Sequence, residues 1–243
     1  MDGVLVLTID NQPKRNALTR DMAQGFQRFL AEAETDASVR CVVIVGAGDK
    51  AFCSGHDLSE MGKSSGDEEG SDEPFSYPLR LTKTTIAVLN GAARAGGFVL
   101  AQSCDIRISE PSANFAANAV RLGMFPLGGQ IGRLPQLVPY AVAYELLATG
   151  RVLEADEAFR HGFINRISEP GQALVEAIAM ARQIVVNSSE AVRSVKTALA
   201  IFAREGIDAA EAFGKAESGK LMHGPDAKEG IAAFLEKRQP KFA

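Results

Sequence analysis

The stretch NGAARAGGFVLAQSCDI, residues 90–106, contains a glycine pair, Gly96 and Gly97, followed by an apolar run. Glycines let the backbone of a helix approach a neighbouring strand closely. The first amide groups of a helix have no acceptor within the helix, and the helix dipole makes that end positive. The stretch therefore predicts a helix that begins at the glycine pair, presents amide donors there and leads into a strand near Ile106.

The same alternation of strand and helix continues on both sides of this stretch. Strands are predicted over residues 4–9, 39–45, 86–89, 106–108 and 163–167, from β-branched and apolar runs. Between the first two, apolar residues recur at helical spacing after Thr19, a candidate N-cap. From residue 171 onward only helices are predicted, over 173–187, 189–204, 207–222 and 226–238. We expect an α/β core over residues 1–186 and a helical region over 187–243.

Composition limits the partners and the compartment. The net charge of −4 and the scattered Lys and Arg residues provide no basic surface for nucleic acid. Three cysteines without a CxxC pair indicate a reducing compartment and no metal site. There is no basic, apolar leader, and every apolar run is shorter than the roughly 18 residues that span a bilayer, so we expect a cytoplasmic protein without membrane insertion. The polar, acidic residues 62–76 predict a mobile surface loop.

Two short motifs resemble known sites but lack the required context. VGAGDKA, residues 45–51, matches the glycine pattern of a dinucleotide-binding turn, yet no helical period follows it. An NAD-dependent dehydrogenase is therefore a distant third interpretation. Ser54, His56 and Asp57 are the residue types of a catalytic triad, but they are neighbours in one turn, whereas a triad needs groups that converge in space.

Two segments have backbone features that suit one common task. In AFCSGHDL, residues 51–58, a turn at Ser54-Gly55 directs the His56 N–H out of the strand ladder. In ARAGGFVLAQS, residues 93–103, the Gly96 N–H lies at a helix start. If the two amides converge, they form an oxyanion hole, in which each donor contributes about 3 kcal/mol. From these residues alone, a tight turn and a close strand–helix junction are an equally good interpretation.

Six segments together resemble the crotonase, or enoyl-CoA hydratase/isomerase, superfamily over nearly the whole chain. They are NQPKRNALT, AFCSGHDLSEM, TIAVLNGAARAGGFVLAQSCDIRIS, FAANAVRLGMFPLGGQIGRLPQLV, ELLATGRVLEADEAFRHGFINRI and DAKEGIAAFLEKRQPKF. The resemblance implies an α/β spiral of repeated ββα units with a C-terminal helical trimerisation region. It also implies an acyl-CoA thioester as ligand, coenzyme A being part of the substrate rather than a separate cofactor, and a homotrimer or hexamer.

The resemblance also assigns roles to individual positions. The oxyanion pair would be the amides of His56 and Gly96. The residues that would bind the coenzyme A moiety are Lys14, Arg15, Ala17, Ser54, Asp57 and Leu58. Phe234 and Lys237 match residues that a neighbouring subunit lays against the nucleotide.

The sequence departs from the family pattern at the proton-transfer positions. Hydratases of this family carry two catalytic glutamates, and the matching positions here are Val99 and Ala119. A third position that some members use for isomerisation or decarboxylation is Leu127. Hydration needs a base and an acid, each contributing roughly 10²- to 10⁴-fold, and none of these side chains transfers a proton. The sequence therefore argues against ordinary hydratase chemistry.

The sequence does not decide the roles of two other side chains, those of His56 and Arg94. Histidine ordinarily titrates near neutrality, so His56 is the best remaining candidate for a general acid or base. Arg94 is placed either to pair with an acyl carboxylate or to lie on the surface against the acidic loop, and we favour the surface.

Two functional classes remain open from the sequence. One is an enzyme that needs little proton transfer from side chains, such as a decarboxylase acting on malonyl-type thioesters or a slow hydratase acting through His56. The other is a non-catalytic acyl-CoA binding protein, which the apolar Val99 and Ala119 would suit.

Overall fold

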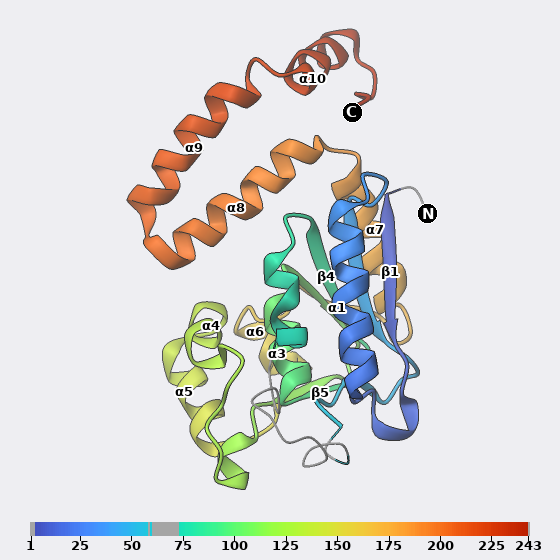
Figure 1. Cartoon of the computed structure of the whole chain (residues 1–243), viewed down its shortest axis with the longest axis vertical. Coiled ribbons are helices and arrows are strands. Elements are labelled where there is room, and N and C mark those ends of the chain that lie inside the picture. The colour runs from blue at the N-terminus through green and yellow to red at the C-terminus, as the bar shows by residue number, and fades with distance from the viewer. Residues whose placement is uncertain (1–2, 58, 60–72, 243) are drawn as a thin grey trace.

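The structure is a computed structural model that describes residues 3–57, 59 and 73–242. Its centre is a parallel sheet of five strands (Figure 1). In order across the sheet they are β1 (Val4–Ile9), β2 (Cys41–Gly46), β4 (Thr84–Leu89), β6 (Ile106–Ser109) and β9 (Arg166–Ile167). Every residue of β2 and β4 is buried, as expected where helices cover both faces of a parallel sheet.

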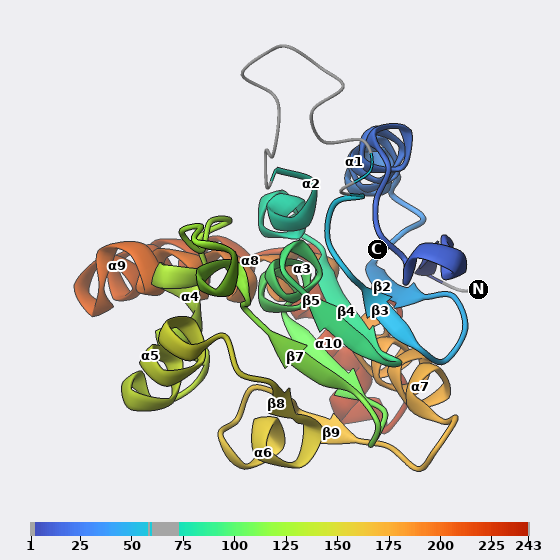
Figure 2. The same ribbon diagram turned by 90° about the horizontal axis from the view of Figure 1, so that it is seen from below.

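A second, smaller sheet lies beside the first and supports the candidate site. Its order is β3 (Ala51–Cys53), β5 (Ala92–Arg94), β7 (Asn114–Ala116) and β8 (Leu153–Glu154), of which β7 and β8 pair antiparallel. Along the chain, β3, β5 and β7 each follow a strand of the large sheet and precede a helix. This repeat of two strands and a helix is the expected spiral of ββα units, and Figure 2 shows α3 packed beside β5.

Helices cover both faces of the large sheet. The helices of the core are α1 (Arg20–Thr35), α2 (Glu73–Ser76), α3 (Gly96–Ser103), α4 (Gln130–Leu137), α5 (Tyr140–Thr149), α6 (Ala155–Arg160) and α7 (Ala173–Val185). Three 3-10 turns join them: η1 (Gln12–Lys14), η2 (Tyr77–Arg80) and η3 (Ala119–Leu122). Leu30 of α1 packs with Val42 and Ile44 on one face of β2, whereas Ala177 of α7 packs with Val43 on the other. This division follows from the alternation of side chains along a strand.

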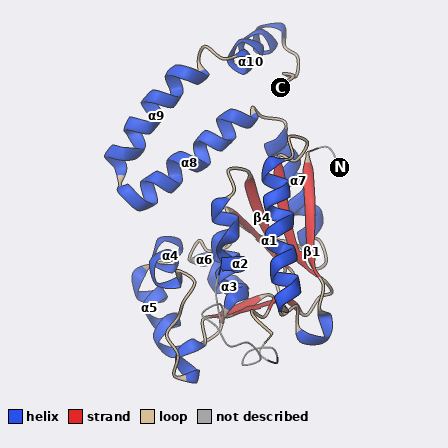
Figure 3. Ribbon diagram, in the orientation of Figure 1, coloured by secondary structure: helices blue, strands red, loops and turns tan. Residues whose placement is uncertain are grey.

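The C-terminal region is an arm of three helices, which Figure 3 shows extending from the sheets. They are α8 (Ser189–Glu205), α9 (Ile207–Leu221) and α10 (Pro225–Glu236). No residue of α8 or α9 is buried in the single chain. Large apolar side chains on α8 are more than half exposed, among them Val195 and Leu199. The arm therefore has an apolar surface that this chain does not cover.

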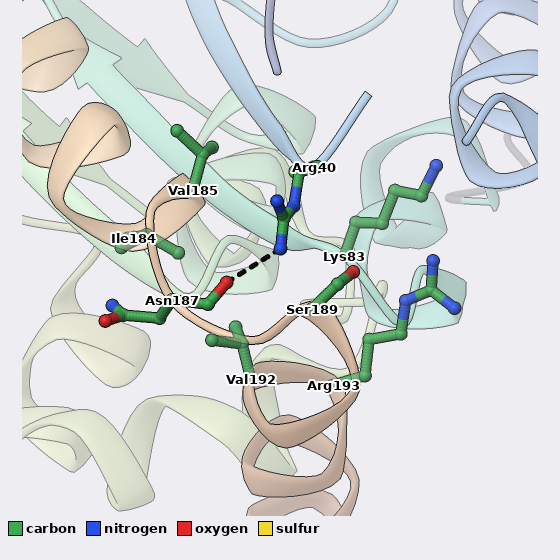
Figure 4. A pocket seen from close by; sticks show the side chains of 8 residues that line it. All are labelled: Arg40, Lys83, Ile184, Val185, Asn187, Ser189, Val192 and Arg193. Carbon is green, nitrogen blue, oxygen red and sulfur yellow. Dashed lines mark hydrogen bonds between the residues drawn. The ribbon is translucent and has the colours of Figure 1, made fainter. Parts of the chain in front are cut away.

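The arm joins the core at a small pocket between α7 and α8 (Figure 4). Its volume is about 10 Å³, room for no more than one water. Arg40 donates to the Asn187 carbonyl across it at 2.7 Å. On the adjoining part of α8, Lys196 Nζ donates to the Lys83 carbonyl at 2.9 Å and to Asp105 Oδ2 at 2.8 Å. These contacts fix where α8 leaves the core.

Most of the predicted elements are confirmed. The helices at the C-terminus match to within two residues, and Thr19 caps α1 by accepting from the Met22 amide at 3.3 Å. No helix begins at VGAGDKA, which instead ends β2 and turns into β3. Cys41, Cys53 and Cys104 are buried free thiols. The division of the chain at residue 186 stays a prediction.

Two predictions need correction. The strand predicted over residues 163–167 is only Arg166–Ile167, because Phe163 and Ile164 instead turn into the core. The loop predicted over residues 62–76 ends earlier, since residues 73–76 form α2 and Phe75 is fully buried. Residues 62–72 lie outside the described part of the chain.

Candidate active site

The segment after β3 is held by a backbone bridge to the segment before α1. The Leu18 amide donates to the Gly55 carbonyl at 2.8 Å, and the Asp57 amide donates to the Leu18 carbonyl at 2.9 Å. In such a parallel bridge the amide of the middle residue, here His56, points to the side opposite the bridge. Gly55 has a φ of +96°, which L side chains rarely adopt, so glycine is required there.

The start of α3 presents the Gly96 amide, which the helix itself does not use. The Phe98 and Val99 amides both donate to the Ala95 carbonyl, at 3.0 and 3.1 Å. Within the described residues, no acceptor contacts the Gly96 amide. Ala95 before it has φ 46° and ψ −118°, a sparsely populated conformation for a residue with a Cβ. The glycine pair opens the helix, as the sequence predicted.

The two segments are in direct backbone contact. A Cβ placed on Gly55 would lie 3.0 Å from the Gly96 nitrogen and 3.3 Å from the Ala95 Cβ. A Cβ on Gly97 would lie 1.9 Å from the Cys53 carbonyl oxygen. Glycine at 55 and 97 is therefore what lets the end of β3 and the start of α3 come together. The segments that carry His56 and Gly96 lie side by side.

An aromatic ring covers this junction. Phe75 of α2 lies with its ring centroid 4.7 Å from that of the His56 imidazole, at an interplanar angle of 79°. A Cβ on Gly96 would lie 2.4 Å from Phe75 Cε2. Sequence analysis missed Phe75, because its neighbours in the chain are polar and acidic. A single phenylalanine at the edge of a polar stretch was the only signal.

Three of the residues expected to bind coenzyme A form one cluster. Lys14 Nζ lies 2.5 Å from Asp57 Oδ2 and donates to Ser59 Oγ at 2.8 Å. Ser54 Oγ donates to the Lys14 carbonyl at 3.0 Å. The hydrogen bond from Lys14 is the largest cause that lowers the pKa of Asp57 to about 2. Asp57 is therefore a carboxylate at neutral pH and not a source of protons.

The other expected binding positions are less closely grouped. Ala17 is buried beside the cluster, whereas Arg15 is exposed and lines a hollow of about 460 Å³ together with Lys50. Asn16, which sequence analysis missed, is buried and donates to the Ala47 and Ala51 carbonyls at 3.0 and 2.7 Å. It ties the turn after η1 to the start of β3. Leu58 lies outside the described residues.

The positions that the resemblance matches to catalytic glutamates, Val99 and Ala119, are apolar, and the structure shows their surroundings. Val99 is 1% exposed within α3 and packs in the core. Ala119 is half-buried at the first residue of η3, and Leu127 is 61% exposed. A proton acceptor introduced at 99 would have to be buried, whereas one at 119 would have access to water.

Arg94 is partly buried on β5 rather than freely exposed. Its guanidinium donates to the Asn114 carbonyl at 2.8 Å and to the Asn114 side-chain oxygen on the adjoining strand. Burial lowers its pKa, which the nearby Glu154 carboxylate opposes. Arg94 therefore links β5 to β7 through these hydrogen bonds. The acidic loop, its other proposed partner, falls mostly in the undescribed residues.

Phe234 and Lys237 do not join this cluster within one chain. Phe234 of α10 is 82% exposed, and Lys237 ends the helix with a φ of 53°. In Figure 1, α10 lies at the opposite end of the molecule from β5. A contact between these residues and the site requires a second chain.

Neither a metal site nor a membrane span emerges from the described part of the chain. No group of three or more His, Cys, Asp or Glu side chains is placed to hold a metal ion there. His161 is the C-cap of α6, and its Nε2 lies 3.7 Å from Glu157 Oε1. Among the helices of the described residues, none is long and apolar enough to cross a bilayer.

The sequence profile described as Enoyl-CoA hydratase/isomerase matches residues 1–243. The chain belongs to the enoyl-CoA hydratase/isomerase family. It is 36% identical over 242 residues to the short-chain-enoyl-CoA hydratase of Clostridium acetobutylicum, which covers 97% of this chain and 92% of that protein. It is 33% identical over 253 residues to the carnitinyl-CoA dehydratase of Salmonella arizonae, covering 98% and 94%.

Solved structures of this family have the same fold. An enoyl-CoA hydratase from Bacillus anthracis superposes with a TM-score of 0.94 at 30% identity, covering 99% of this chain and 95% of that one. A probable enoyl-CoA hydratase/isomerase from Mycobacterium abscessus gives a TM-score of 0.91 at 35% identity, covering 100% and 95%. The family and the α/β fold inferred from the six segments are both confirmed.

Proposed function

We propose that this member of the enoyl-CoA hydratase/isomerase family binds an acyl-CoA thioester and holds its carbonyl oxygen between the amides of His56 and Gly96. The proposal depends on one observation, the backbone contact between Gly55 and the Gly96 nitrogen. Two donors fixed in this way stabilise a developing oxyanion without reorganisation, each by about 3 kcal/mol. Coenzyme A enters as part of the substrate, alongside Lys14 and Asp57.

The reaction is one that needs little proton transfer from side chains. Val99 and Ala119 neither accept nor donate a proton, so they give no support to ordinary hydration. Decarboxylation of a malonyl-type thioester suits the site, because carbon dioxide leaves with its bond pair remaining as an enolate. The two amides would stabilise the enolate oxygen, and solvent or His56 would supply the proton to the α-carbon.

Binding through the carbonyl can be separated from binding through coenzyme A. Titration calorimetry should compare butyryl-CoA with its thioether analogue S-butyl-CoA, which lacks the carbonyl oxygen. The thioester should bind more tightly, by about tenfold or more, because only it engages the two amides. Equal affinities would contradict the oxyanion proposal, and absence of binding by both would contradict acyl-CoA binding altogether.

A second candidate function is acyl-CoA binding without catalysis, which is favoured by the apolar side chains at Val99 and Ala119. Turnover on a panel of malonyl-, enoyl- and hydroxyacyl-CoA thioesters separates the two candidates. An enzyme should release product faster than the same thioester does without protein, for at least one of these thioesters, and His56→Ala then shows whether the imidazole supplies the proton. Binding without any product above the protein-free rate would favour the non-catalytic function.

Restoring carboxylates tests whether only the acids are missing. Ala119→Glu should fold, because position 119 is half-buried, whereas Val99→Glu would bury a carboxyl group in the core and raise its pKa. We expect hydration of crotonyl-CoA to appear with Ala119→Glu and to increase in the double variant if that variant folds. Ala119→Gln is the matched control, since its amide has the same shape but cannot act as a base.

The exposed apolar arm supports an assembly of copies of this chain. We propose a homotrimer or hexamer in which Phe234 and Lys237 of one subunit lie against the nucleotide bound by another. Phe234 is 82% exposed in the single chain, and α10, which carries it, lies far from β5 in Figure 1, which supports a role between subunits. A Lys237→Glu variant should weaken binding of free CoA but not of dephospho-CoA if this lysine contacts the 3′-phosphate. Equal weakening of both ligands would count against that contact.

A further inference from the structure

Phe75 is an aromatic residue whose position neither the family motifs nor the composition predicts. It is fully buried although it lies only three residues beyond an undescribed polar stretch. It belongs to α2, which packs against the start of α3. Its ring contacts two residues, His56 and Gly96, and these are the residues whose amides would hold the thioester carbonyl.

The ring is held by a well-anchored segment. The 3-10 turn η2 follows α2 directly, and its Pro78 carbonyl accepts from the Leu81 amide at 3.3 Å. Lys196 of the arm donates to the same carbonyl at 3.4 Å and to the Lys83 carbonyl at 2.9 Å. The segment that follows Phe75 is therefore held by the core and by α8, and the fully buried ring forms a wall of the junction.

A fixed ring at this place limits what the thioester can carry. The carbonyl carbon lies one bond from the oxygen that the amides hold, so the first carbons of the acyl group must pass close to His56 and Gly96. Phe75 already fills the space against the Cα of Gly96, where a Cβ would come within 2.4 Å of the ring. Interiors are close-packed, so this ring and additional acyl carbons cannot share the same volume.

We propose that Phe75 determines specificity by excluding acyl groups that carry a branch next to the carbonyl. This inference rests on the proposed binding of acyl-CoA at the amides of His56 and Gly96. Removing the ring should enlarge the acyl site next to the carbonyl. The substitution should therefore favour acyl groups branched at the α-carbon selectively and not weaken all ligands alike.

The test is calorimetric binding of CoA, butyryl-CoA and 2-methylbutyryl-CoA to the full chain and its variants. Wild type should prefer butyryl-CoA over 2-methylbutyryl-CoA, and Phe75→Ala should shift that ratio by about tenfold or more toward 2-methylbutyryl-CoA. Phe75→Leu, which leaves a smaller cavity, should shift it in the same direction and serves if the alanine variant does not fold. Phe163→Leu is the matched control, because Phe163 is equally buried but packs with Phe98 and Phe115.

The outcomes separate this inference from the proposed function. An unchanged ratio in Phe75→Leu and Phe75→Ala, or a wild type that binds 2-methylbutyryl-CoA as tightly as butyryl-CoA, overturns the role of Phe75. A uniform loss of affinity for both acyl-CoA ligands also overturns it, because it marks Phe75 as a packing residue. If neither acyl-CoA binds more tightly than CoA in any variant, the proposed function itself fails.

Discussion

At the scale of single residues, the candidate site consists of backbone positions that side chains only support. Gly55 and Gly97 allow β3 and α3 to touch, and Ala95 has a strained φ of 46° immediately before the Gly96 amide. Strain of this kind costs about 1–3 kcal/mol and persists only where the surrounding structure enforces it. Holding the Gly96 amide in its position therefore costs the fold some stability.

The glycines could be predicted from the sequence, whereas their neighbours could not. A glycine pair before an apolar run indicates a close approach whatever its partner is. Phe75 and Asn16 act through contacts with residues distant in the sequence, and no local pattern specifies such contacts. Lys83 is a similar case, a buried lysine whose Nζ donates to the Ala33 and Asp36 carbonyls at the end of α1.

The Lys14–Asp57 pair predicts a defined dependence of stability on pH. The folded pKa of Asp57, about 2, lies below its ordinary value of 3.8, so the ionised carboxylate favours the folded state. Its contribution is complete above that ordinary value and is lost as pH falls toward about 2. Asp57→Asn should therefore lower the free energy of unfolding at neutral pH, and the difference from wild type should narrow in acid.

Urea titrations of both proteins across this pH range measure the effect. Asp10→Asn, at an exposed position just after β1, is the control and should leave the profile unchanged. A difference between Asp57→Asn and wild type that stays constant down to the acid limit would contradict a depressed pKa.

At the scale of elements, α3 is fixed at both ends by different chemistry. Its start presents the Gly96 amide, and its end is capped by Arg107 of β6. The Arg107 guanidinium donates to the Cys104 carbonyl at 2.6 Å and to the Ala101 carbonyl at 3.2 Å. Its Nε donates to the Phe163 carbonyl at 2.5 Å. A cation at a helix C-terminus also complements the helix dipole.

Removing this cap should be costly. Arg107→Met would leave three buried carbonyls without their donor, so we expect the free energy of unfolding to fall by about 2–4 kcal/mol. Arg166→Met, at an exposed position of β9, should change it by no more than about 0.5 kcal/mol. Chemical denaturation monitored by circular dichroism measures both. A loss in Arg107→Met as small as in the control would show that the cap does not stabilise α3.

At the scale of the whole molecule, the compact core and the extended arm differ in how they bury apolar surface. The sheets and their helices form a core within the chain, whereas α8 exposes Val195, Leu199 and Phe202 along one face. These residues recur at the spacing that places side chains on one side of a helix. The sequence predicted these helices accurately because helical periodicity is local. It could not predict where they lie, since that depends on what covers them.

The exposed face of α8 predicts association through the arm. Val195→Glu with Leu199→Glu should convert the proposed trimer or hexamer to a monomer, because charges replace the apolar contact. Light scattering after size-exclusion chromatography measures the mass, and Glu205→Gln on the same helix is the control. A wild type that is monomeric at working concentrations would contradict the proposed assembly.

The central claim is that two main-chain amides polarise a thioester carbonyl in a site whose usual acids are absent. Isotope-edited infrared spectroscopy of butyryl-CoA labelled with ¹³C at the carbonyl observes that bond directly. The account predicts that the carbonyl band moves to lower frequency when the ligand binds the protein, because the hydrogen bonds from His56 and Gly96 weaken the C=O bond. A bound ligand whose carbonyl band stays at its frequency in water or moves higher would contradict it.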